Sequence, residues 1–175
     1  MLNFKKIGKK NICLIGLMGS GKSIIGKELS NIYDTNFFDS DLEIEKKENL
    51  SINLIFKNYG ENYFRKVEEE ICLSLLNKSN TIISLGGGSI INNKIRKSIE
   101  NSSYSIYLKV DINILMKRLN NSNRRPLLQT TDKKNKLENL YKVRKKFYNN
   151  ADLIIENNKN KKEAIKEIES YINLI

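Results

Sequence analysis

Residues 11–23 read Asn-Ile-Cys-Leu-Ile-Gly-Leu-Met-Gly-Ser-Gly-Lys-Ser, and this stretch decides the fold. Residues 11–16 form a short apolar run that ends at glycine, which predicts a buried β-strand. Residues 22–33 carry apolar side chains at helical spacing, so a helix is expected directly after the glycines. The apolar face of that helix would consist of Ile25, Leu29 and Ile32.

The loop between that strand and helix fits the pattern Gly-x-x-x-x-Gly-Lys-Ser/Thr, which is the pattern of a phosphate-binding P-loop. Glycines let successive backbone N–H groups turn towards phosphate oxygens, and the following helix directs its positive dipole end at the same anion. Lys22 would reach the β- and γ-phosphates, and the Ser23 hydroxyl would bind Mg²⁺. The alternative is a glycine-rich turn that only caps a helix, but the full match between a strand and a helix favours a nucleoside triphosphate. The expected nucleotide-binding residues are Gly19, Ser20, Gly21, Lys22 and Ser23.

Strands and helices are expected to alternate along the rest of the chain. Further strands are predicted at residues 36–38, 81–85, 104–110 and 153–156. Helices are predicted at residues 41–59 (as two short ones), 60–77, 92–100, 111–119, 134–149 and 161–172. This alternation predicts an α/β fold of three layers, in which helices cover both faces of a five-stranded parallel sheet. Ligands of such sheets bind outside the carboxyl ends of the strands, where Gly16, Asp39 and Gly86 stand.

Length and composition exclude several classes of protein. A chain of 175 residues is expected to form one domain, residues 1–175. It has no histidine, which excludes His-based catalysis and His metal ligands, and its two cysteines cannot build a disulfide scaffold or a four-ligand zinc site. We expect Cys13 and Cys72 to be reduced thiols in the core.

The net charge of +11 comes from lysines that are scattered along the chain, so we expect solvated helix faces and no nucleic-acid partner. No apolar run is long enough for a membrane span, and no signal peptide is evident. A cytoplasmic protein with no membrane partner is therefore expected.

Two aspartates follow the predicted second strand at Phe37-Phe38-Asp39-Ser40-Asp41. In an extended segment, residues i and i+2 point to the same side, so both carboxylates could face one cleft. Mg²⁺ sites in proteins use one or two carboxylates together with phosphate oxygens and water, which makes Asp39 a candidate metal partner through water. Asp41 could accept the hydrogen bond, and the proton, of a substrate hydroxyl. The alternative is that one of the two aspartates is the N-cap of the next helix.

Arginines are few, so those in special settings are informative. A planar guanidinium binds a carboxylate in a forked arrangement, and Arg65 and Arg144 are placed on predicted helices where they could hold a carboxylate of the substrate. Arg125 lies in the polar stretch of residues 120–135, whose length is typical of a lid, and could close over the transferred phosphoryl group. Arg96 and Arg124 have no such setting and are expected at the surface.

Three consecutive glycines, Gly86, Gly87 and Gly88, follow the predicted strand at 81–85. Such a triplet lets the backbone approach a ligand closely and donate N–H groups to it. The alternative is a flexible turn. The triplet is expected at the same sheet edge as the P-loop and the aspartates, and this position favours ligand binding.

Taken together, these segments resemble the shikimate kinases. The resemblance rests on GLMGSGKS at 16–23, FFDSD at 37–41, IFKNYGENYFRKVEEE at 55–70, ISLGGGSI at 83–90, RRPLL at 124–128 and the segment at 144–151. It covers nearly the whole chain in order. One departure is that Lys146 stands where the family usually has the proline of Arg-x-Pro-x-Tyr, although Arg144 and Tyr148 keep their spacing.

The resemblance implies a reaction and an architecture. The family uses ATP and Mg²⁺ to phosphorylate the 3-hydroxyl of shikimate, a step towards chorismate and the aromatic amino acids. Its fold is similar to that of nucleoside monophosphate kinases, which would place a lid at about 120–135 and a substrate-binding helical segment at about 41–70. A monomer is expected.

The resemblance also implies roles for individual residues. Shikimate would be bound by Asp41, Arg65, Gly86, Gly87, Gly88 and Arg144, with the two arginines holding its carboxylate. Lys22 and Arg125 would neutralise charge on the phosphates, Arg118 would lie near the nucleotide base, and Asp39 would support Mg²⁺ through water. The expected catalytic residues are Lys22, Asp41 and Arg125. The pocket lining would include Phe56, Phe64, Glu68 and Pro126.

Three other readings stay open at this point. A related small-molecule kinase, for gluconate or a nucleoside monophosphate, would share the P-loop, and a neutral acceptor would need no pair of arginines for a carboxylate. A degenerate, inactive relative is disfavoured by the intact Lys22, Ser23, Asp39 and Asp41. A nucleic-acid-binding NTPase is favoured only by the charge, and it would show a steep salt dependence. The loop near 157–161 carries no signature for the nucleotide base.

Overall fold

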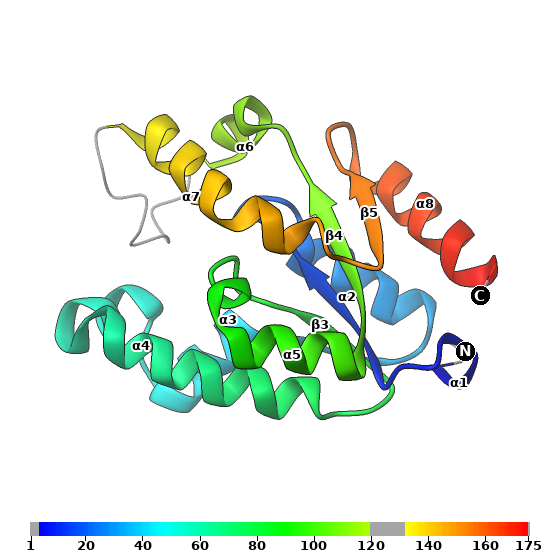
Figure 1. Ribbon diagram of the computed structural model, residues 1–175, viewed down its shortest axis with the longest axis horizontal. Coiled ribbons are helices and arrows are strands. Elements are labelled where there is room, and N and C mark those ends of the chain that lie inside the picture. The colour runs from blue at the N-terminus through cyan, green and yellow to red at the C-terminus, as the bar shows by residue number, and fades with distance from the viewer. Residues whose placement is uncertain (1–3, 120–131, 175) are drawn as a thin grey trace.

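The computed structural model describes residues 4–119 and 132–174 and shows a parallel sheet between two layers of helices (Figure 1). Its five strands are β1 (Asn11–Ile15), β2 (Asn36–Asp39), β3 (Thr81–Ser84), β4 (Ser103–Lys109) and β5 (Leu153–Glu156). They are hydrogen-bonded in the order β2-β3-β1-β4-β5, and every pairing is parallel. The predicted fold class is therefore confirmed.

Both faces of the sheet are buried because successive strand residues point to opposite sides. In β1, Ile12 and Leu14 belong to one apolar cluster, whereas Cys13 and Ile15 belong to the other. The first cluster is covered by α2 (Lys22–Ile32) and α8 (Lys161–Leu174), together with Phe4 from the short helix α1 (Phe4–Ile7). Thus β1, which is one continuous apolar run in the sequence, contributes side chains to the apolar clusters on both faces of the sheet.

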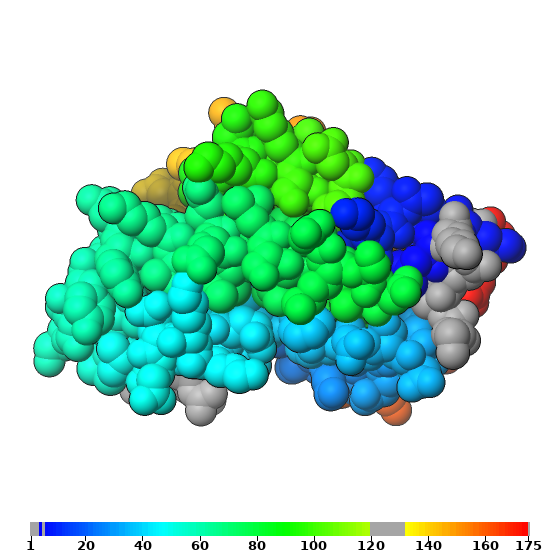
Figure 2. Space-filling model, turned by 90° about the horizontal axis from the view of Figure 1, so that it is seen from below, coloured from blue at the N-terminus to red at the C-terminus, as the bar shows by residue number. Residues whose placement is uncertain are grey.

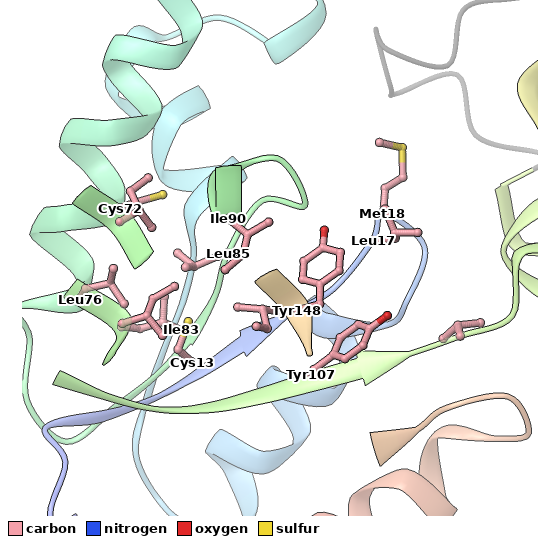
Figure 3. Packing of buried hydrophobic residues seen from close by; sticks show 14 of the residues in the cluster. Cys13, Leu17, Met18, Cys72, Leu76, Ile83, Leu85, Ile90, Tyr107 and Tyr148 are labelled. Carbon is pink, nitrogen blue, oxygen red and sulfur yellow. The ribbon is translucent and has the colours of Figure 1, made fainter. Parts of the chain in front are cut away.

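The opposite face is covered by four helices: α4 (Ile52–Leu76), α5 (Asn93–Ser102), α6 (Ile112–Leu119) and α7 (Lys133–Tyr148). Cys72 and Leu76 of α4 pack against the strands next to Ile83, and Tyr107 lies beside Tyr148 near the loop that follows β1 (Figure 3). The two thiols are fully buried, and burial raises the pKa of Cys72 to about 12. Helices α4 and α5 are in contact, and the space-filling view from below shows atoms of the two segments, teal and green, next to each other on the surface (Figure 2).

The predicted helices and strands agree with the observed ones to within a few residues, with local exceptions. Ile32 was expected on the buried face of α2 but is 47% exposed, because it lies at the last residue of the helix, beyond the sheet contacts of Ile25 and Leu29. The segment predicted as two helices is α3 (Ser40–Glu48) followed by the beginning of α4. A kink at Gly60, with φ 78° and ψ 174°, divides α4 near the predicted boundary. Helix α1 and the 3-10 turn η1 (Ser89–Ile91) were not predicted.

The predicted lid falls almost wholly outside the described residues, as do Arg124, Arg125 and Pro126. Within residues 4–119 and 132–174, no helix has the length and apolar character that crossing a membrane would need.

Candidate active site

The carboxyl ends of three neighbouring strands meet at one edge of the sheet. The P-loop follows β1, the glycine triplet 86–88 follows β3, and Asp39 ends β2. Because β3 lies between β2 and β1, the triplet sits between the P-loop and the aspartates. Gly87 packs so closely on the P-loop that a Cβ there would lie 3.1 Å from the Gly16 carbonyl oxygen and 3.2 Å from the Met18 nitrogen.

The P-loop has the backbone that its glycines predict. Gly16, Gly19 and Gly21 all have positive φ angles, of 143°, 80° and 96°, which residues with a Cβ rarely adopt. Gly21 is the N-cap of α2 and provides no side-chain cap, so the first N–H groups of the helix are available to an anion. Lys22 is buried, and its Nζ donates to the carbonyl oxygens of Gly16 (2.8 Å) and Leu17 (3.1 Å). A buried ammonium among backbone groups fits a polyphosphate ligand.

Asp39 is the N-cap of α3, which is one of the two roles weighed for it, and its second carboxylate oxygen lies beside Ser23. Its Oδ1 accepts the N–H groups of Asp41 (3.0 Å) and Leu42 (3.4 Å) and so caps α3, while its Oδ2 accepts the Ser23 hydroxyl at 2.5 Å. The cap fixes the carboxylate next to the Ser23 hydroxyl, so that a hydrated Mg²⁺ bound beside this pair could contact Ser23 directly and Asp39 through water. No group of three or more metal-ligating Cys, Asp or Glu side chains exists within the described part of the chain, so a cation here would depend on phosphate oxygens and water.

Asp41 reaches the site by a route that differs from the expected one. The argument from an extended segment is wrong because α3 begins at Ser40, so Asp39 and Asp41 do not belong to one strand. Asp41 instead projects from the first turn of α3 towards the glycine triplet, where a Cβ on Gly86 would meet its Oδ1 at 2.6 Å. The Ser40 hydroxyl accepts the Gly86 N–H at 2.8 Å, which joins α3 to the triplet.

Arg65 on α4 faces the other end of the triplet, since a Cβ on Gly88 would lie 2.6 Å from its Nη1. Two carboxylates hold it: Glu61 at 2.8 Å and the buried Glu68 at 2.6 Å. Burial by itself lowers the pKa of the Arg65 guanidinium, but the carboxylates of Glu68 and Glu61 outweigh that effect and raise it. The guanidinium is therefore charged and fixed in direction before any ligand binds.

Arg144 on α7 is in a very different state, because its side chain is almost fully buried, with 1% exposed. Its Nε and Nη1 have no hydrogen-bond partner, and no salt bridge joins it to a carboxylate, among residues 4–119 and 132–174. It hydrogen-bonds the Tyr148 hydroxyl, which in turn donates to the Gly87 carbonyl oxygen at 2.6 Å. A buried guanidinium with free donors is costly unless an anion binds it, and a substrate carboxylate fits that need.

Tyr148 was noted in the sequence only for its spacing from Arg144. It is fully buried, its ring stacks on Tyr107 with centroids 4.9 Å apart, and burial raises the pKa of its hydroxyl (Figure 3). Its hydroxyl connects Arg144 to the triplet, a role that the four-residue spacing alone could not reveal. Arg96, expected at the surface, is partly exposed, and its guanidinium lies 4.1 Å from the centroid of the Phe147 ring and donates to the carbonyl oxygens of Ile90 and Ile91.

A pocket of about 500 Å³ opens beside the P-loop, where a nucleotide would lie. Arg118, expected near the nucleotide base, lines this pocket and donates to the Asn157 carbonyl oxygen at 2.9 Å. The sequence did not identify Asn157. The other lining residues are Gly19, Gly21, Lys22, Ser23, Ile24, Ile25 and Lys161.

Comparison with known proteins gives consistent matches over nearly the whole chain. A family model described as "Shikimate kinase" matches residues 18–173. The chain is 43% identical over 164 residues to the shikimate kinase of Clostridium botulinum (strain Okra / Type B1), covering 93% of this chain and 96% of the relative. It is 40% identical over 171 residues to the shikimate kinase of Bartonella quintana (strain Toulouse), covering 95% of this chain and 81% of the relative.

A solved structure, shikimate kinase from Acinetobacter baumannii in complex with shikimate, is similar with a TM-score of 0.91 and 31% sequence identity. That match covers 94% of this chain and 93% of the other.

Proposed function

Because this chain belongs to the shikimate kinase family, we propose that it transfers the γ-phosphoryl group of ATP to the 3-hydroxyl of shikimate. The observation that carries the choice of an anionic acceptor is Arg144, a buried guanidinium whose Nε and Nη1 have no hydrogen-bond partner among the described residues, at the sheet edge that also holds the P-loop. A neutral acceptor would leave this cation without a counter-charge. The expected product is shikimate 3-phosphate, on the way to chorismate and the aromatic amino acids.

The nucleotide would be held by the P-loop, with Lys22 on the β- and γ-phosphates and Arg118 at the base. Ser23 and, through water, Asp39 would hold Mg²⁺, which supplies charge neutralisation on the phosphates. Their hydroxyl and carboxylate oxygens are already 2.5 Å apart and fixed by the cap of α3. The contact between Ser23 and Asp39 would therefore keep both groups beside the phosphates.

The acceptor would lie across the glycine triplet, with Arg65 and Arg144 on its carboxylate and Asp41 on its reacting hydroxyl. Asp41 would orient that hydroxyl and receive its proton as the phosphoryl group is transferred in line, without a covalent intermediate on the enzyme. Gly87 and Gly88 would offer their N–H groups at the same edge, whereas the Gly86 N–H is already donated to the Ser40 hydroxyl. Catalysis in this account comes from positioning and preorganised charge.

Further parts of the proposal concern the whole molecule. Arg125, carried by a lid at about 120–135, would close over the phosphates and exclude water. We propose that the protein works as a single-domain monomer in the cytoplasm, with shikimate as its small-molecule partner and no nucleic-acid partner.

The carboxylate-anchor role is tested by Arg65→Ala with two acceptors, shikimate and its methyl ester. Loss of a charged hydrogen bond raises the KM for shikimate by about 10- to 100-fold and leaves the KM for ATP almost unchanged. Wild-type enzyme should prefer shikimate strongly over the ester, and the variant should lose most of that preference. Lys94→Ala is the matched control, because Lys94 also pairs with a carboxylate of α4, Glu69, but is exposed.

Equal effects of Arg65→Ala on the KM of ATP and of shikimate would refute the anchor. The alternative, a kinase for gluconate or a nucleoside monophosphate, predicts turnover with those acceptors and no response to shikimate. Both outcomes are read from the same assay of ADP release.

A further inference from the structure

Asn157, the first residue after β5, is a buried polar residue in the wall of the nucleotide pocket, with 3% of its surface exposed. Its backbone N–H donates to the Lys109 carbonyl oxygen at 2.8 Å, which holds it at the end of β4. Its backbone carbonyl accepts from Arg118 at 2.9 Å. The backbone of Asn157 thus ties the base-side arginine to the sheet.

The side chain of Asn157 makes a separate contact with the P-loop, because its Nδ2 donates to the Ser20 carbonyl oxygen at 2.8 Å. The contact is tight: a Cβ on Gly21 would lie 3.0 Å from the same Nδ2. The direction of the amide is also settled by chemistry, since turning it over would place Oδ1 against another carbonyl oxygen. Among residues 4–119 and 132–174, Oδ1 has no hydrogen-bond partner, so the bond to Ser20 alone orients the amide.

The hydrogen bond from Asn157 to the Ser20 carbonyl oxygen also fixes the direction of the Gly21 N–H, because both groups belong to one peptide. A trans peptide is planar, and its C=O and N–H point in opposite directions. Holding the Ser20 carbonyl against Asn157 therefore turns the Gly21 N–H away from Asn157 and fixes the plane of the peptide. Gly21 has φ 96°, a conformation from which glycine can rotate easily, so the loop itself does little to prevent a flip of this peptide.

We infer that Asn157 is a positioning residue for the nucleotide phosphates: its amide clamps the Ser20–Gly21 peptide so that the Gly21 N–H stays directed at the bound anion. The inference rests on the proposed function only in that a nucleotide occupies the P-loop; it needs no particular acceptor. Because Asn157 lies far from the P-loop in sequence, the clamp joins the last strand to the first loop of the site.

The test is the affinity for MgADP and for adenosine, measured by calorimetry and by competition, in Asn157→Leu and Asn157→Asp. Both variants keep the number and branching of the side-chain heavy atoms and the backbone carbonyl that holds Arg118. Leucine removes the amide donor, and aspartate replaces it with a negative charge. We expect Asn157→Leu to weaken MgADP binding by about tenfold, the loss of one preorganised hydrogen-bond donor. Asn157→Asp should weaken it further, since a carboxylate repels both the Ser20 carbonyl and the phosphates. Adenosine binding and the KM for shikimate should not change.

The matched control is Asn160→Ala. Asn160 lies in the same loop and caps α8 by accepting the Glu163 N–H at 3.0 Å, but it is exposed and does not touch the P-loop. It should lower the melting temperature without changing MgADP affinity. Unchanged MgADP binding in Asn157→Leu, or an equal loss for adenosine and MgADP, would overturn the inference.

If Asn157→Leu does not fold, Asn157→Ser decides in the same way, because its shorter side chain cannot reach Ser20 but remains polar. The binding measurement is independent of phosphoryl transfer. A wild-type protein that binds MgADP but ignores shikimate would therefore refute the proposed acceptor and leave this test intact.

Discussion

Replacing Arg144 by Met separates two effects of the buried charge: its cost to folding stability and its contribution to shikimate binding. The Arg144 side chain is 1% exposed, and its Nε and Nη1 have no partner among the described residues. Methionine is similarly long and unbranched, so it can fill the space of the guanidinium's stem without leaving a large cavity. The variant removes a cation that the fold must desolvate and that only a bound anion can compensate.

The replacement should stabilise the ligand-free protein but weaken its binding of shikimate. Replacement of a buried charge by an apolar side chain of similar volume is commonly neutral or stabilising by about 1–4 kcal/mol, so the ligand-free variant should melt a few degrees higher than the wild type, at about 2–4 °C per kcal/mol. Two charge-assisted hydrogen bonds to a carboxylate are worth about 3 kcal/mol or more together, so the KM for shikimate should rise by at least about 100-fold.

The assay is thermal unfolding with and without shikimate, followed by steady-state kinetics. Wild-type protein should gain stability from saturating shikimate, by about 2.7 kcal/mol at a hundred times Kd, and Arg144→Met should gain almost none. Arg118→Met is the control, since it should change the KM for ATP and leave that for shikimate alone. An Arg144→Met protein that is less stable than wild type yet binds shikimate normally would refute the reasoning, because Arg144 would then be a structural cation.

Three further perturbations test other parts of the site. Asp41→Asn should lower kcat by about 10²-fold at saturating substrates, because the amide cannot receive the proton of the substrate hydroxyl. Steady-state rates measure this, and an unchanged kcat would show that Asp41 takes no part in the chemical step. Gly87→Ala should lower kcat/KM for shikimate by about tenfold or more, because the alanine Cβ would lie 3.1 Å from the Gly16 carbonyl oxygen and push the triplet away from the P-loop. Wild-type kinetics in this variant would show that the contact between the triplet and the P-loop can adjust. Burial raises the pKa of Cys72 to about 12, above its value in the unfolded chain, so its contribution to stability is fully present below about pH 9 and is lost as the pH rises towards 12. Denaturant unfolding at several pH values should show a slope of up to about 1.4 kcal/mol per pH unit from this thiol, and Cys72→Ala should reduce that slope; an identical slope in both proteins would contradict the assignment.

The sequence was sufficient for the fold because apolar runs and glycines carry most of its information. The continuous run of β1 predicts a strand buried on both faces, and the glycines after it predict the positive φ angles that the P-loop adopts. The position of the site also followed, since parallel strands bring Gly16, Asp39 and Gly86 to one edge.

What the sequence could not predict depends on contacts between distant segments. Spacing suggested that Asp41 faces the site from a strand, whereas it does so from the first turn of α3, because the Asp39 cap starts the helix earlier. The sequence also did not show that the partly exposed Arg96 lies against Phe147, which is on another helix. Asn157 had no signature because its partner, Ser20, lies at the other end of the chain.

The electrostatic difference between the two arginines was equally hidden. Both were expected to hold a carboxylate, but Arg65 is already paired with Glu61 and Glu68, whereas the buried Arg144 has two donors without a partner in the described part of the chain. Glu61 and Glu68 could have been read as helical neighbours of Arg65 at spacings of four and three residues. No spacing rule would reveal that Arg144 lacks such a neighbour in space.

ADP release from purified protein and MgATP, measured with and without shikimate in one coupled assay, tests the proposed phosphorylation of shikimate. The product would then be identified by mass spectrometry and ³¹P NMR. We predict release that depends strongly on shikimate and a product that carries phosphate on the 3-hydroxyl. ADP release that shikimate does not change would contradict the account.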